Sequence, residues 1–136
     1  MSRILVAEDD PHILRVICMW LSRQGHEVRE ARNGLAALQQ LCDQCPDILI
    51  TDINMPGMDG LELLRHVTSR QPRPHGIVVL TNRWDHRKIG EQLANAGVLV
   101  MPKPFSPSKL AELIQSLGAA ASAAARSTTA TAEGIE

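Results

Sequence analysis

The sequence predicts an α/β domain in which a parallel sheet is covered by helices on both faces. Short apolar runs alternate five times with stretches whose apolar residues recur at helical spacing, and such alternation favours parallel strands joined by helices. The run at 77–80 is apolar throughout, which is typical of a strand buried on both faces. The runs at 3–7 and 47–51 end directly before acidic residues.

The composition is that of a single domain. The chain has 136 residues, of which 44% are hydrophobic, enough for one substantial core. A formal net charge of -1 gives no electrostatic reason to expect nucleic acid or an anionic membrane as a direct partner. Neither a membrane-spanning run nor a signal peptide is visible, so a cytoplasmic location is expected. The cysteines number three, and this odd number does not suggest a disulfide framework.

The first strand is predicted at 3–7, followed by a helix that Asp10 caps, with Pro11 at its first position. The apolar residues that recur at helical spacing in this helix are Ile13, Val16, Ile17 and Trp20. The helix is expected to end at Gln24–Gly25. A weaker, alternating strand follows at 26–31.

Asn33–Gly34 predicts a turn or cap before a second helix, marked by Leu35, Leu38 and Leu41. The third strand, 47–51, delivers Asp52 to a Pro/Gly turn. The remaining elements are predicted in this order: a helix at 61–68, a strand at 77–80, a helix at 85–96, a strand at 98–101 and a helix at 106–117. The domain is therefore expected to occupy 1–118. The Ala/Ser/Thr-rich segment 119–136 has too little apolar bulk to pack, and a disordered tail or linker stub is expected there.

Polar side chains gather where the predicted strands end. In a parallel sheet all carboxyl ends lie at one edge, which is where open α/β sheets bind ligands. That edge would collect Glu8, Asp9, Asp52, Thr81 and Lys103. Three carboxylates repel one another unless a cation neutralises them. Mg²⁺ suits such a site, because it accepts a few carboxylate oxygens and leaves room for a phosphate oxygen. A hydroxyl and an ammonium are the donors that a phosphoryl group needs.

These residues lie in motifs: Val6-Ala-Glu-Asp-Asp-Pro11, the segment 52–60 with Met-Pro-Gly-Met-Asp-Gly, Val79-Leu-Thr81 and Lys103-Pro104-Phe105. Through them the chain resembles, from residue 3 to about 117, the CheY-like receiver domain of two-component response regulators. The resemblance implies a flavodoxin-like (βα)5 fold with sheet order 2-1-3-4-5. It also implies Mg²⁺ as the cofactor, bound by Asp9, Asp52 and the backbone carbonyl of Asn54, with Glu8 holding a metal-bound water.

The resemblance further implies that Asp52 is the phosphoacceptor. Lys103 would form an ion pair with the phosphoryl group, and Thr81 would move inward to donate a hydrogen bond to it. The expected function is that of a single-domain receiver, not a conventional enzyme. A histidine kinase or histidine phosphotransfer protein would phosphorylate it. An output protein would bind the face made by the fourth helix, the fifth strand and the last helix.

Two alternatives keep the same fold. One is a degenerate receiver that serves as a phosphorylation-independent interaction module or a phosphate sink. The other is a phosphatase with Asp52 as nucleophile. Phosphatases of the haloacid-dehalogenase type have a second acid two residues after the nucleophile, where this chain has Asn54.

The chain departs from the family at three positions. Val100 replaces the usual switch aromatic, the bulky Asn82 follows the threonine, and Pro102 precedes Lys103. Proline removes a donor from the sheet, which is tolerated if the fifth strand is an edge. We therefore expect phosphorylation to reshape the loop after Thr81 and the fourth helix without an aromatic flip.

Two further features remain. Cys42-Asp-Gln-Cys45 has the CxxC spacing of redox motifs. A thiol pair at a helix end is generally inert, so redox sensing is kept as an alternative. Arg83 and the run His86-Arg-Lys88 make the start of the predicted fourth helix basic, which fits either a solvated face or a partner contact.

Overall fold

The computed structural model describes residues 2–53, 55, 57–58, 60–70, 72–81, 98–102, 106 and 108–117. Its elements follow in the order β1 (Arg3–Ala7), α1 (Pro11–Arg23), β2 (Glu27–Ala31), α2 (Gly34–Asp43), β3 (Ile48–Asp52), α3 (Gly60–Thr68), β4 (Gly76–Thr81) and β5 (Val98–Pro102). A further helix covers 108–117. The predicted helix 85–96 and the segment 119–136 lie outside the described residues.

The five strands form one parallel sheet in the order β2-β1-β3-β4-β5, so the predicted fold and strand order are confirmed. Among the strands that the structure describes, β5 pairs only with β4, with Thr81 opposite Pro102. The proline is therefore on an edge strand, as its missing N–H requires. The strand bounds differ from the predicted ones by about one residue, because pairing with a neighbour extends β3 to Asp52 and β4 to Thr81.

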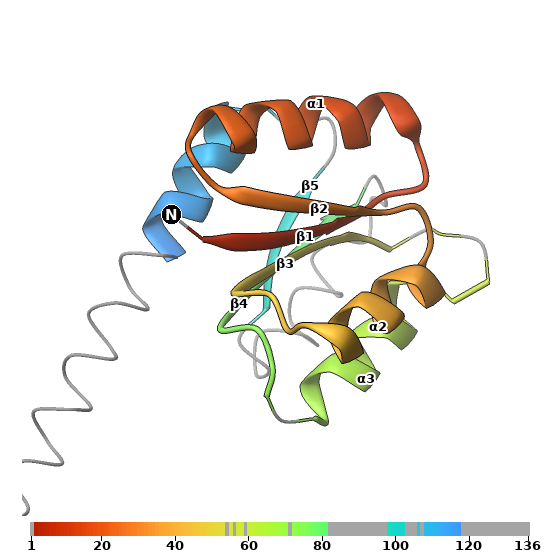
Figure 1. Ribbon diagram of the computed structural model, residues 1–136. Coiled ribbons are helices and arrows are strands. Elements are labelled where there is room, and N and C mark those ends of the chain that lie inside the picture. Colours follow the sequence, from red (N-terminus) through yellow and green to blue (C-terminus); the bar gives the residue numbers. More distant parts are fainter. Residues whose placement is uncertain are drawn as a thin grey trace, which may run out of the picture.

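Helices cover both faces of the sheet (Figure 1): α1 and the helix at 108–117 lie on one side, α2 and α3 on the other. Side chains alternate between the two faces along each strand. Leu5 and Leu49 point toward α2 and α3, while Ile4 and Ile50 point toward α1. All four are essentially inaccessible to solvent, which explains the continuous apolar runs of the central strands.

The helix boundaries follow the predicted caps. Asp10 Oδ1 accepts hydrogen bonds from the backbone N–H groups of His12 (2.9 Å) and Ile13 (3.4 Å). Asn33 caps α2 by accepting from Ala36 N–H at 2.7 Å. Gly25 follows α1 with a φ of +90°, a conformation that glycine adopts without steric cost.

The apolar pattern of α1 predicts the helix but not its buried side. Leu14, Ile17 and Leu21 are buried, whereas Val16 and Trp20 are exposed by 42% and 37%. In α2, similarly, Leu41 is buried but Leu35 is 56% exposed. Both helices carry more apolar residues than the face against the sheet can accept.

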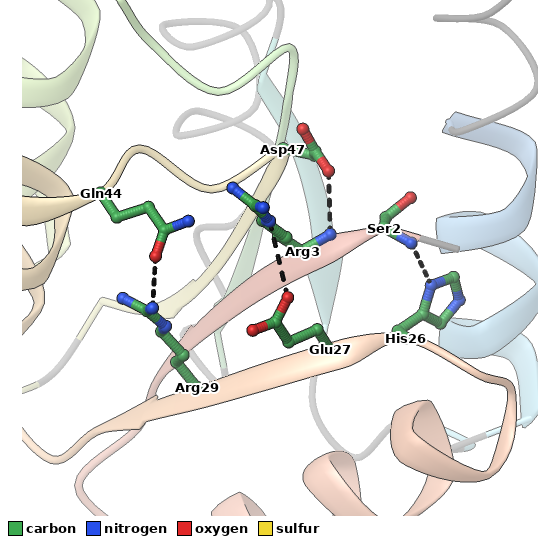
Figure 2. A network of polar contacts seen from close by, with 7 residues as sticks. All are labelled: Ser2, Arg3, His26, Glu27, Arg29, Gln44 and Asp47. Atoms are coloured by element: carbon green, nitrogen blue, oxygen red, sulfur yellow. Dashed lines mark hydrogen bonds and ion pairs between the residues drawn. The ribbon is translucent and has the colours of Figure 1, made fainter.

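The amino-terminal edge of the sheet is held by polar contacts (Figure 2). The Asp47 carboxylate accepts a hydrogen bond from the backbone N–H of Arg3 at 2.9 Å, and the Arg3 guanidinium lies 3.5 Å from Glu27. Arg29 donates to the side-chain oxygen of Gln44. This edge is opposite to the one at which β3 ends in Asp52.

Candidate phosphoacceptor and metal site

Three acidic side chains meet at the carboxyl edge of the sheet. Glu8 and Asp9 follow the end of β1, and Asp52 is the last residue of the adjacent β3. One carboxylate oxygen from each lies within 4.8 Å of the other two. The structure thus brings together the three acids that the sequence placed at this edge.

Backbone contacts fix these acids in position. Glu8 N–H donates to the carbonyl of Ala31 at 3.0 Å, which ties it to the end of β2. Glu8 Oε1 accepts from Asp10 N–H at 3.2 Å. Asp52 Oδ1 accepts from Ile53 N–H at 2.8 Å, which orients its carboxylate. Glu8 and Asp52 each have further interactions besides these.

The acids differ in their access to solvent. Glu8 is fully buried and Asp52 is 4% exposed, whereas Asp9 is exposed. Buried carboxylates are stable as anions only beside opposite charge or hydrogen-bond donors. α1 begins at Pro11, two residues after Asp9, and the N-terminus of a helix favours negative charge. The combination of two buried carboxylates and one exposed carboxylate fits a hard divalent cation with oxygen ligands, such as Mg²⁺.

Close packing constrains the segment after Asp52. A Cβ on Gly60, the first residue of α3, would overlap the backbone carbonyl oxygen of Asp52 and the Cα of Ile53. A Cβ on Gly34, at the start of α2, would overlap the carbonyl oxygen of Met58. In the sequence, Gly34 is only a turn or cap signal, and Gly60 is only one residue of the motif at 52–60. Both glycines allow the start of a helix, α2 or α3, to approach the backbone of the segment after β3 closely.

The other predicted site residues can be placed only in part. Thr81 is the last residue of β4, directly after Leu80, which pairs with Asp52. Lys103 follows the end of β5 in the sequence but lies outside the described residues, as does Asn54. Their assigned roles remain predictions.

Comparison with known protein families identifies the family of this chain. Residues 4–115 match the model of the response regulator receiver domain. The chain belongs to this family. Receiver-domain relatives include the transcriptional regulatory protein ResD of Bacillus subtilis (strain 168), 31% identical over 118 residues that make up 85% of this chain and 48% of ResD.

The phosphate regulon transcriptional regulatory protein PhoB of Escherichia coli (strain K12) is 30% identical over 116 residues, 85% of this chain and 51% of PhoB. The chain thus spans about half the length of these curated relatives. Among solved structures, the chemotaxis response regulator CheY4 of Vibrio cholerae superposes with a TM-score of 0.77 at 28% identity, covering 86% of this chain and 98% of CheY4. This receiver domain therefore shares its fold with a chemotaxis regulator.

Among the described residues, no helix combines the length and apolar character needed to cross a bilayer.

Proposed function

We propose that this receiver domain is a phosphorylation-controlled switch in which Asp52 accepts a phosphoryl group from a histidine kinase or a histidine phosphotransfer protein in the cytoplasm. One observation carries the proposal: one carboxylate oxygen from each of Glu8, Asp9 and Asp52 lies within 4.8 Å of the other two at the carboxyl edge of the sheet. An anionic nucleophile attacks an anionic phosphoryl group only where the charges are neutralised.

In the transfer step, an Asp52 carboxylate oxygen forms a bond to phosphorus while the bond from phosphorus to the donor imidazole nitrogen breaks. The imidazole leaves with the bonding electrons and takes up a proton. The Ile53 N–H, 2.8 Å from Asp52 Oδ1, holds the carboxylate in one orientation during the attack. Positioning and charge neutralisation supply most of the rate in phosphoryl transfer.

The chain's own groups have distinct tasks around this step. Asp9, Asp52 and the Asn54 carbonyl would hold Mg²⁺, and Glu8 would hold it through a water. When bound, the ion neutralises charge on the carboxylates and the phosphoryl oxygens. Lys103 and the Thr81 hydroxyl are proposed to bind the remaining phosphoryl oxygens.

We propose that the output is contact with another protein, through the face that includes β5. Leu99 is 39% exposed on this edge strand, while Val100 packs partly against the core beneath it. The phosphoryl group would bias the domain between two conformations that differ in affinity for that partner. We propose that the chain acts as a phosphoacceptor and not as a conventional enzyme.

Mg²⁺-dependent labelling by acetyl phosphate tests the proposal. Intact-mass analysis should show one added phosphoryl group in the wild type, none after addition of a chelator and none in Asp52→Asn. Asp10→Asn is the matched control, because it removes a neighbouring charge while retaining a capping side chain, and it should be labelled like the wild type.

The same experiment separates the alternatives. A folded wild type that stays unlabelled with Mg²⁺ present would favour the phosphorylation-independent interaction module and overturn the proposal. Sustained hydrolysis of a phosphomonoester that requires Asp52 would instead favour the phosphatase.

A further inference from the structure

The CxxC segment has an arginine neighbour that the sequence does not reveal. Arg70, which follows α3, donates from Nη1 to Cys42 Sγ at 3.0 Å. Cys42 is exposed near the end of α2, and Cys45 is half-buried in the loop before β3. The charge of Arg70 also acts on Cys45. The Arg70 guanidinium therefore contacts one thiol and interacts electrostatically with the other.

The segment between the two cysteines is anchored on both sides. α2 ends at Asp43, and Gln44 leaves the helix in an extended conformation (φ -153°, ψ 112°). The Gln44 side chain is held by Arg29, and Asp47 is held by the backbone of Arg3 (Figure 2). The cysteine positions are therefore defined by contacts with β1 and β2.

The two thiols differ in environment. Cys42 is exposed to solvent, so a dissolved oxidant can reach it, and its Sγ lies within hydrogen-bond distance of the Arg70 guanidinium. Cys45 Sγ lies 3.5 Å from the carbonyl oxygen of Pro46. Burial, followed by the Asp47 carboxylate, raises the pKa of Cys45, although Arg70 opposes the rise. Cys42 is thus suited to react first and Cys45 second.

We propose that Cys42 and Cys45 form a redox-modifiable pair, in which a hydroperoxide oxidises Cys42 and Cys45 then closes a disulfide. In the first step, the Cys42 thiolate attacks one peroxide oxygen and the O–O bond breaks. The sulfur becomes a sulfenic acid, and the leaving oxygen takes up a proton to form water or an alcohol. In the second step, Cys45 sulfur attacks Cys42 sulfur, the S–O bond breaks, and water leaves with the Cys45 proton. An external dithiol reverses the reaction.

The third cysteine is an internal control. Burial, followed by Glu30, raises the pKa of Cys18 to about 12, so this thiol should stay reduced under the same treatment.

The test treats the reduced full chain with hydrogen peroxide, followed by mass analysis with and without dimedone. We expect the wild type to lose two hydrogens and to map to a Cys42–Cys45 disulfide that dithiothreitol reverses. Cys45→Ser should stop at a dimedone-trapped sulfenic acid on Cys42, and Cys42→Ser should not react.

Arg70→Ala should slow the oxidation of Cys42, because it removes the cationic donor that lies 3.0 Å from the sulfur. Arg70→Lys should restore most of the rate, and Arg65→Ala, which removes an exposed arginine of α3, should leave it unchanged. Absence of the intramolecular disulfide in the wild type, or an Arg70→Ala rate equal to that of the wild type, would overturn the proposal. Asp52→Asn should be oxidised like the wild type, so the result does not depend on phosphorylation.

Discussion

Replacing Asp52 by Asn should make the Mg²⁺-free domain more stable. One carboxylate oxygen of Glu8 and one of Asp52 are at most 4.8 Å apart, and both side chains are buried. Two unit charges at that separation repel by about 3.5 kcal/mol at an effective dielectric constant of about 20. The exposed Asp9 adds roughly 1 kcal/mol at the dielectric constant of water. Asparagine keeps an oxygen that can accept from Ile53 N–H, so this hydrogen bond is retained.

The backbone donors to these carboxylates, Asp10 N–H and Ile53 N–H, offset part of this repulsion, so we expect a net gain of about 1–3 kcal/mol in the free energy of unfolding. That gain corresponds to a rise in melting temperature of roughly 4 °C per kcal/mol. The assay is urea unfolding followed by circular dichroism, in chelator and then in Mg²⁺. The wild type should gain about 2.7 kcal/mol at an Mg²⁺ concentration 100 times the dissociation constant, and Asp52→Asn should gain much less.

Asp10→Asn is the control in this experiment as well, because it lowers the negative charge without entering the cluster or removing the cap. It should change the stability by less than about 0.5 kcal/mol and leave the Mg²⁺ response intact. The reasoning is refuted if Asp52→Asn is no more stable than the wild type in chelator, or if Mg²⁺ stabilises both equally.

Three other perturbations test the packing and the pH response. Ile17→Ala should lower the free energy of unfolding by about 2–5 kcal/mol, because Ile17 is completely buried. Val16→Ala should lower it by less than about 1 kcal/mol. Equal losses in urea unfolding would contradict the assigned buried side of α1. Gly60→Ala should destabilise the domain by more than about 2 kcal/mol, since the added Cβ would overlap the Asp52 carbonyl. It should also lower acetyl phosphate labelling. A variant that is fully labelled and as stable as the wild type would disprove this contact. Partial burial, and then the amino-terminal charge, lower the pKa of His26 from 6.5 in the folded protein. The neutral imidazole therefore stabilises the fold above pH 6.5, and this stabilisation is lost as the pH falls from 6.5 to the lower pKa of the folded state. His26→Gln should flatten that part of the pH–stability curve, and an unchanged curve would count against the assignment.

The strands and the three acids could be predicted from the sequence because each rests on a local signal. An apolar run that ends on an acid marks both a buried strand and its tip, as at Asp52. Parallel topology then brings the tips of adjacent strands together, so Glu8 and Asp52 meet although 44 positions separate them in the chain. The strand order itself came from family resemblance, since alternation alone allows several orders.

The buried side of α1 could not be predicted in the same way. Apolar residues occur almost all round this helix, so the positions 13, 16, 17 and 20 fit a helical period as well as the buried positions do. Packing against the sheet and the helix at 108–117 decides which residues are buried, and it selects Leu14, Ile17 and Leu21. The contact between Arg70 and Cys42 could not be predicted from the sequence either, because it joins residues 28 positions apart at the ends of two different helices.

The proposed thiol oxidation and the proposed phosphorylation take place at opposite ends of β3. Cys45 precedes β3 and Asp52 ends it, and the five residues of this strand span about 16 Å. That distance is about twice the Debye length at physiological ionic strength, so a change of charge at the thiols reaches the acids only weakly. A mechanical effect would require β3 to shift in register, and β3 is held by parallel pairing with both β1 and β4. Because a shift of one residue would turn Leu49 and Ile50 toward the wrong faces, the strand resists it. Oxidation of the thiols and phosphorylation of Asp52 should therefore be independent signals in this domain.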